Sequence, residues 1–272
     1  MKRIVVMLSL AMALMITGCA KTQTKELEKK VIRFATNGPH IDMFEEAKIQ
    51  IEENTDYTVE ITTFDDVVQP NVAVVEGSAD CNFFQHKPYL ESYVKEYDAD
   101  LTPWGGKPVY ALEFGIYSEK VKSIGELREG AQIVFGRDPS NKAIALRFLE
   151  EQGLIKLKEG VELPELVDIV DNPKNLKLTE MDISAVAKSL EDPEVDAIVV
   201  MGMSLARQGK DPSTAIAFGS DELISNFVMV IAVKEENKDA EWGQVVYDAL
   251  TSQRLLDYYE EHYKGTIRPI KN

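Results

Sequence analysis

Short apolar runs alternate with longer segments of helical periodicity along most of the chain. Residues 31–36, 57–64 and 79–84 are rich in β-branched and aromatic side chains, which is typical of strands. Between the first two runs, Met43 and Ala47 have the spacing of one helix face. Because strand and helix patterns alternate, the sequence predicts an α/β fold with mainly parallel sheets flanked by helices.

A helix with recognisable ends is predicted over residues 139–152. Asp138 suits the N-cap, Pro139 suits the first turn, and Gly153 suits the stop. Further on, residues 195–201 and 226–233 are continuous apolar runs of the kind that lie inside a covered sheet.

The last long periodic segment, residues 242–259, predicts one amphipathic closing helix. Internal repeats and low-complexity segments are not evident in the sequence.

The amino terminus has the pattern of an export signal. Lys2 and Arg3 precede an apolar core over residues 4–16, which is shorter than the roughly 20 apolar residues of a membrane-spanning helix. The quartet at 16–19, Ile-Thr-Gly-Cys, resembles a bacterial lipobox, in which cleavage falls before a cysteine that carries lipid (palmitate). The alternative is an ordinary secretory signal followed by an incidental cysteine.

We therefore expect a signal peptide over 1–18, a lipidated Cys19 and a polar tether over 19–30. Lipid on Cys19 anchors a folded body at a membrane surface without spanning the membrane. The chain has one other cysteine, Cys81, which is left without an intramolecular partner and is expected to be buried on a strand.

The composition excludes several classes of function. The chain has a formal charge of −16, and removal of Lys2 and Arg3 with the signal makes it −18. This acidity argues against nucleic acid as a partner. The sequence has no GxSxG, HExxH or CxxC motif of an enzyme and no GxxxxGK[ST] loop for ATP. We therefore expect neither a catalytic residue nor a cofactor.

Aromatic side chains gather at one predicted junction between a strand and a helix, in ADCNFFQHKPYL at residues 79–90. Ligands of open α/β sheets collect beyond the carboxyl ends of strands, so Phe84, His86 and Tyr89 are expected to face a crevice. In the alternative interpretation the rings fill the core and His86 bonds a nearby carbonyl group.

Several blocks resemble the methionine-binding lipoproteins of the NlpA type. The four blocks are DDVVQPNVAVVEGSADCNFFQHKPYL at 65–90, RDPSN at 137–141, GLIKLKEG at 153–160 and NPKNLKL at 172–178. The resemblance implies the solute-binding lipoprotein of an ABC importer, with a two-lobed periplasmic-binding-protein-like fold of type II. Residues 31–110 and 221–272 are expected to form lobe 1, and residues 111–220 lobe 2.

The same resemblance implies a function and partners. The protein is expected to capture methionine or a related amino-acid-like solute and to deliver it to an ABC permease, from the outer face of the bacterial cytoplasmic membrane or a periplasm-facing membrane. Phe84, His86 and Tyr89 match the family's FQHKPY motif, which contributes to the side-chain pocket. Asn141 matches a position beside the ligand, at a helix amino terminus that favours a carboxylate.

The chain departs from the family pattern at four positions. Residues that are usually polar in the family are replaced by Val67, Ile144, Met201 and Met229. We expect Met201 and Met229 to line the cleft with Ile144 and the rings, which predicts a less polar or differently oriented ligand than free methionine. The family usually has arginine at the position of Ile144. Arg137 and Arg147 are candidates to supply that positive charge instead, and the alternative places both at the surface.

Two further hypotheses remain open. A metal-binding importer lipoprotein would use His40 and His86 with a carboxylate such as Asp80, although the three histidines lack a ligand-like spacing. A transport-inactive surface lipoprotein would have an empty cleft that does not close.

Overall fold

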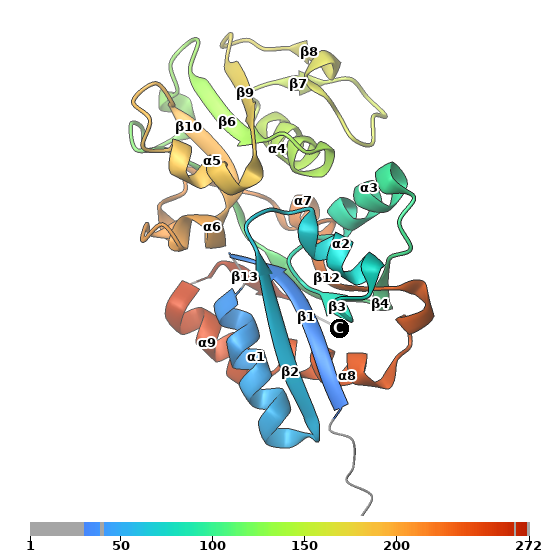
Figure 1. The fold of residues 1–272 in the computed structure, drawn as a ribbon. Coiled ribbons are helices and arrows are strands. Elements are labelled where there is room, and N and C mark those ends of the chain that lie inside the picture. Colours follow the sequence, from blue (N-terminus) through green and yellow to red (C-terminus); the bar gives the residue numbers. More distant parts are fainter. Residues whose placement is uncertain (1–29, 39–40, 264, 271–272) are drawn as a thin grey trace, which may run out of the picture.

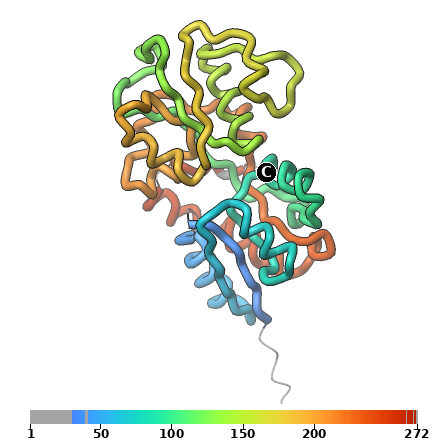
Figure 2. Tube along the Cα trace, turned by 45° about the horizontal axis from the view of Figure 1, so that its top comes forward, coloured from blue at the N-terminus to red at the C-terminus, as the bar shows by residue number. Residues whose placement is uncertain are grey.

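The structure is a computed structural model that describes residues 30–38, 41–263 and 265–270. The predicted signal peptide, Cys19 and nearly all of the tether lie outside the described residues. Two lobes, each built on its own sheet, lie one above the other in Figure 1, and the turned view in Figure 2 shows the same division.

The first lobe has a six-stranded sheet covered on both faces. Its strand order is β13 (Ile267–Pro269), β4 (Thr102–Leu112), β12 (Val228–Val233), β3 (Cys81–Asn82), β1 (Lys30–Asn37) and β2 (Tyr57–Phe64). One face packs against α1 (Ile41–Asn54), α8 (Glu241–Leu250) and α9 (Gln253–Tyr263). The other face packs against α2 (Gln69–Glu76) and α3 (Lys87–Tyr97).

The second lobe has a five-stranded sheet. Its order is β11 (Ala217–Phe218), β5 (Phe114–Tyr117), β10 (Ala197–Met201), β6 (Gln132–Gly136) and β9 (Lys177–Met181). Helix α4 (Pro139–Glu151) covers one face, and α5 (Ile183–Ser189) and α6 (Gly202–Ala206) cover the other. A small pair, β7 (Lys156–Leu157) and β8 (Ile169–Asp171), follows α4, and α7 (Asp221–Ser225) leads back to the first lobe.

The predicted two-lobed α/β class is confirmed, and the sheets prove to be mixed. Strands β1, β2 and β3 pair in parallel, as do β6, β9 and β10. In the two large sheets the antiparallel pairs all involve β4, β5 or β12, which lie where the chain passes between the lobes. A strand that returns from the other lobe is not tied to the helix crossover that makes its neighbours parallel. The residue boundaries proposed for the lobes remain a prediction.

The helix predicted after Asp138 has the expected ends. Asp138 Oδ1 accepts a hydrogen bond from the Asn141 N–H group at 3.0 Å, and Gly153 has φ of +69° beyond the last turn. The single closing helix predicted over 242–259 is instead two helices, α8 and α9. Ser252 separates them because its Oγ accepts the Leu255 N–H group at 3.1 Å and so starts a new helix.

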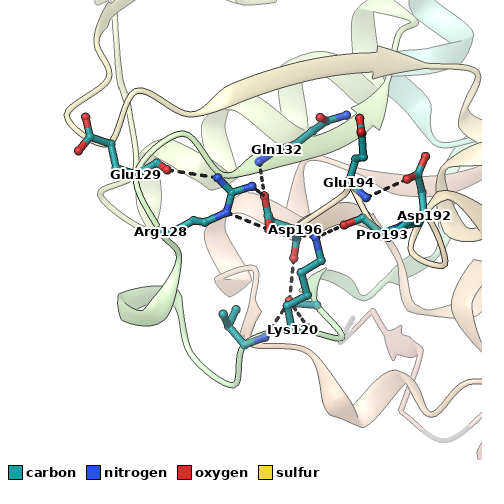
Figure 3. A network of polar contacts seen from close by, with 10 residues as sticks. Lys120, Arg128, Glu129, Gln132, Asp192, Pro193, Glu194 and Asp196 are labelled. Carbon is teal, nitrogen blue, oxygen red and sulfur yellow. Dashed lines mark hydrogen bonds and ion pairs between the residues drawn. The ribbon is translucent and has the colours of Figure 1, made fainter.

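A network of hydrogen bonds and ion pairs joins the amino ends of β6 and β10 in the second lobe, as Figure 3 shows. The Asp196 carboxylate accepts the Gln132 N–H group at 2.8 Å, Arg128 Nη2 at 2.7 Å and Lys120 Nζ at 3.1 Å. Burial alone would raise the pKa of Asp196, but these donors outweigh burial and lower it. The carboxyl ends of β6 and β10 therefore project from a fixed base toward the first lobe.

Cys81 lies fully buried on β3, as the sequence predicts. Among the described residues, no helix combines the length and apolar character needed to cross a bilayer.

Candidate functional site

A cavity of about 260 Å³ lies between the lobes, where the carboxyl ends of strands from both sheets meet. It is lined from the first lobe by Asn37, Gly38, Val67, Phe84, Gln85, His86 and Tyr89. It is lined from the second lobe by Asn141, Ile183, Ser184, Ala187, Met201, Ser204, Arg207 and Gln208. This is the location that open α/β sheets favour for ligands, because the loops and helix amino termini leave a crevice there.

Three buried amide side chains hold the first lobe's wall in place. Asn71 Oδ1 accepts hydrogen bonds from Asn82 Nδ2 at 2.8 Å and from Gln85 Nε2 at 2.6 Å. Asn71 Nδ2 donates to Gln85 Oε1 at 3.1 Å, and Gln85 Nε2 also donates to Asn82 Oδ1 at 2.8 Å. We name Asn71, Asn82 and Gln85 the amide cluster. It joins the QPN and NFFQH segments and thereby fixes the chain that carries the rings.

The adjacent rings of Phe83 and Phe84 point in different directions because side chains alternate along an extended chain. Phe83 is fully buried in the core of the first lobe, against Phe44 and Tyr110. Phe84 turns to the cavity and meets the Tyr89 ring edge to face, with centroids 6.0 Å apart. Phe83 therefore fills the core, as in the alternative interpretation, whereas Phe84 faces the cavity, as in the crevice interpretation.

Tyr89 is anchored by its hydroxyl group. The hydroxyl donates to the Val67 carbonyl group at 2.8 Å, so the ring closes one side of the cavity. Burial is the main cause that raises the pKa of the Tyr89 phenol, and nearby Asp138 adds to it. The phenol therefore remains protonated and keeps its donor.

His86 and Asn141 connect the two lobes. His86 Nδ1 accepts the Tyr89 N–H group at 3.1 Å, which caps α3 and leaves the proton of the neutral ring on Nε2. Nε2 then donates to Asn141 Oδ1 at 3.4 Å, while Asn141 Nδ2 donates to Asp138 Oδ2 at 2.9 Å. Burial lowers the pKa of His86 more than Asp138 and Asn141 raise it, so the imidazole is neutral at neutral pH.

The second lobe's wall is crowded beside Gly136 at the end of β6. A Cβ atom added there would lie 2.8 Å from Asn141 Cβ and 2.9 Å from Ile183 Cδ1. Glycine at this position therefore lets α4 and α5 approach each other and bring Asn141 and Ile183 to the cavity.

Arg207, which follows α6, brings a positive charge to the cavity wall. Its Nη1 lies 3.4 Å from Asp42 Oδ2 on α1 of the first lobe, and 27 % of its side chain is exposed. The same Asp42 oxygen accepts the Tyr263 hydroxyl group at 2.6 Å. Asn37, five residues before Asp42, also lines the cavity, and its Oδ1 has no hydrogen-bond partner among the residues that the structure describes.

The structure places five of the six residues predicted for ligand contact, all except Met229, at this cavity: Phe84, His86, Tyr89, Asn141 and Met201. Val67, one of the four departures from the family pattern, also lines it. Sequence reasoning missed Asn37 and Arg207. Asn37 directly follows the strand predicted over 31–36, so the preference of ligands for the carboxyl ends of strands could have indicated it. Nothing in the sequence marks Arg207.

Two residues that the sequence places at the cleft lie in the core instead. Met229 is fully buried and shares the inner face of β12 with Ile231, because alternate residues of a strand share a face. Ile144 is fully buried against Phe114 and Phe227, on the side of α4 that faces β5 and α7.

Neither candidate arginine reaches the cavity. Arg137 is largely exposed and its Nη2 pairs with Asp182 at 3.2 Å. Arg147 donates to the carbonyl groups of Val161 and Glu162 at 2.6 and 2.9 Å. The cation at the cavity wall is therefore supplied by Arg207 rather than by either of these residues.

Of the residues weighed for a metal site, the structure describes Asp80 and His86 but not His40. The Asp80 carboxylate pairs with the Arg33 guanidinium group at 2.6 Å, and His40 lies outside the described residues. Within the described ranges, no group of three or more His, Cys, Asp or Glu side chains is arranged to hold a metal ion.

A two-lobed α/β protein with a cavity at the facing carboxyl ends of its strands has the architecture of a solute-binding protein. Comparison with known proteins identifies the family. The model of the NlpA lipoprotein family matches residues 32–271, so this chain belongs to the NlpA lipoprotein family.

Individual relatives agree with this assignment over most of their length. The D-methionine-binding lipoprotein MetQ of Yersinia pestis is 35 % identical over 266 residues, which are 97 % of this chain and 96 % of the relative. A nutrient binding protein from Burkholderia cenocepacia, solved bound to methionine, has a TM-score of 0.82 at 33 % identity, over 88 % of this chain and 100 % of that one. An ABC transporter periplasmic substrate-binding protein from Coxiella burnetii has a TM-score of 0.82 at 31 % identity, with the same coverage.

Proposed function

We propose that this protein is the solute-binding lipoprotein of an ABC importer and captures methionine or a related amino-acid-like molecule between its lobes. Capture is noncovalent, and the protein acts as a carrier rather than as an enzyme. The ligand stabilises the closed arrangement because it contacts both lobes, and a ligand shifts such an equilibrium only by its differential affinity for the two states.

The observation that carries the proposal is the cavity itself. It is lined by both lobes, and aromatic and aliphatic side chains share its surface with a few amide and hydroxyl groups. Its volume of about 260 Å³ lies just below the range of roughly 300 to 1,000 Å³ for drug-sized ligands, which favours a small solute. The relatives named for methionine support the choice of solute class.

The proposal extends to location and partners. A lipid on Cys19 would hold the protein at the outer face of the cytoplasmic membrane or at a periplasm-facing membrane. The closed form would then dock on a membrane permease, whose cytoplasmic ATPase supplies the energy. Family membership supports the lipid anchor, and the Coxiella relative supports the ABC transporter.

Mass spectrometry of small molecules released from the lipidated chain, extracted gently in detergent, tests the proposal directly. We expect one amino-acid-like compound to be released. Adding it, or methionine, back to the emptied protein at about 100 times the dissociation constant should stabilise the fold by about 2.7 kcal/mol.

A variant pair locates the binding in this cavity. Phe84→Ala removes a ring from the wall and should weaken binding about tenfold, since burial of such a side chain is worth about 1.5 kcal/mol or more. Phe218→Ala is the control, because Phe218 is 42 % exposed and lies outside the cavity. If no compound is released and neither methionine nor its relatives raise the melting temperature, the proposed function is wrong.

A further inference from the structure

The formal charge in the described lining of the cavity is positive. Among the lining residues that the structure describes, Arg207 alone carries a formal charge at neutral pH, because His86 is neutral there and no aspartate or glutamate contributes. A small solute enclosed here meets a cation but no carboxylate. Such a wall favours a ligand with an anionic group, because an enclosed charge requires a partner of opposite sign.

Arg207 pairs with a residue of α1, whereas Tyr89 is carried by α3, and these two helices cover opposite faces of the first lobe's sheet. The partner on α1 is Asp42, and α6 precedes Arg207. Figures 1 and 2 both show α6 and α3 on opposite sides of the region between the lobes. The cavity therefore has a cationic side near α1 and α6 and an aromatic side near α3.

The cationic side offers further polar contacts. The buried Asn37 amide shares this side, because it ends β1 shortly before α1, and within the described part of the chain its Oδ1 has no hydrogen-bond partner. A guanidinium group presents five N–H donors, and Arg207 lines the cavity with 27 % of its side chain exposed. A planar carboxylate matches the geometry of a guanidinium group.

We propose that Arg207 selects the ligand by its carboxylate and sets its orientation, with the carboxylate at Arg207 and the apolar chain against Phe84 and Tyr89. This inference rests on the proposed function and narrows its ligand class to small carboxylates with an apolar chain. The carboxylate is required. The amino group of an amino acid is dispensable, because the described lining offers no anionic group to an ammonium ion.

Calorimetric titration of the emptied wild-type protein with three probes tests this selection without any substitution. The probes are methionine, methioninamide, which lacks the carboxylate, and 4-(methylthio)butanoate, which lacks the amino group. We expect methionine and 4-(methylthio)butanoate to bind within about tenfold of each other. Methioninamide should bind about tenfold to a hundredfold more weakly, as expected for the loss of a charge-assisted contact.

Substitutions then assign the selection to one residue. Arg207→Gln should lose about tenfold to a hundredfold in affinity for both carboxylates and leave methioninamide almost unchanged. Arg207→Lys should fall between wild type and Arg207→Gln, because it keeps the charge but not the paired donors. The matched control is Arg137→Gln, whose guanidinium pairs with Asp182 outside this cavity and whose loss should not change affinity.

The outcomes separate this inference from the proposed function. Equal binding of methionine and methioninamide, or unchanged affinity in Arg207→Gln, would overturn the role of Arg207 while the proposed function stands. Failure of every probe to bind wild type would overturn both. A folded Arg207→Gln variant is verified by urea unfolding, and the three-probe comparison on wild type decides the question even if that variant does not fold.

Discussion

The two walls of the cavity are built in different ways. The first lobe's wall rests on the amide cluster and on rings whose polar atoms are bonded within the protein. The second lobe's wall comes largely from the short helices α5 and α6 and from Arg207 beyond them. One wall is fixed by its own hydrogen bonds, whereas the other carries the charge and most of the exposed polar groups.

We therefore expect the first wall to hold the shape of the cavity and the second wall to select the ligand. A network whose members satisfy one another holds a shape but offers few groups to a guest. Ser184 and Gln208 of the second wall are exposed, and substitutions of exposed side chains usually change stability by less than about 0.5 kcal/mol. Substitutions in the first wall should therefore be costly to folding, and substitutions in the second wall should mainly alter the choice of ligand.

The largest effect is expected for Asn71→Ala. Asn71 is fully buried, and its loss removes the acceptor of Asn82 and Gln85 and the donor of Gln85 Oε1. Each buried group left short of a partner costs about 1–3 kcal/mol, so we expect a loss of about 4 kcal/mol in the free energy of unfolding. Urea unfolding measures it.

Asn226→Ala provides the matched control for that variant. Asn226 is exposed, and its side chain donates to the Glu222 carbonyl group at 3.1 Å. Its loss should therefore change the free energy of unfolding by less than about 0.5 kcal/mol. Equal effects of the two substitutions would show that the amide cluster does not hold the first wall.

Ile144→Ala tests the core that lies behind the second wall. Ile144 is fully buried against Phe114 and Phe227, so truncation leaves a void and should cost about 3 kcal/mol of stability. Ligand affinity should change little, because Ile144 does not line the cavity. Ile49→Ala on the exposed face of α1 is the control, since Ile49 is 42 % exposed. A large loss of affinity in a stable Ile144→Ala protein would place this residue at the ligand after all.

The sequence predicts the first wall better than the second. Residues 79–90 mark it because the rings, the amides and the helix start are adjacent in the chain. The second wall is assembled from segments after three different strands, and Arg207 follows a helix with no motif. Ile144 and Met229 were misplaced for a related reason: helix and strand periodicity shows that a residue faces inward, but not whether core or cavity lies there.

Tyr89→Phe should have a smaller effect, confined to one bond of the first wall. The variant keeps the ring and leaves the Val67 carbonyl group without its 2.8 Å donor, which should cost about 1–1.5 kcal/mol of stability. Thermal unfolding measures this against Tyr97→Phe, whose side chain is at the exposed end of α3. An affinity loss above tenfold in Tyr89→Phe would mean that the hydroxyl bonds the ligand rather than only the wall.

His86→Gln is expected to have the smallest effect, and one that depends on pH. At neutral pH the variant loses the weak contact to Asn141 and part of the α3 cap, which should cost about 1 kcal/mol. Because burial lowers the pKa of His86, the unfolded chain binds a proton at a higher pH than the folded chain does. The wild-type free energy of unfolding therefore falls as the pH drops through the ordinary histidine value of about 6.5.

The variant lacks this loss, so the stability gap between wild type and His86→Gln should narrow from about pH 7.5 to about pH 5.5. Urea unfolding at both pH values measures the gap. The control is His262→Gln on the exposed face of α9, which keeps His86 and should therefore show the same change of unfolding free energy with pH as wild type. A gap that widens on acidification would mean that Asp138 and Asn141 hold a charged imidazole. The contact between the lobes would then be an ion pair, and the first wall would share with the second the charge that now distinguishes them.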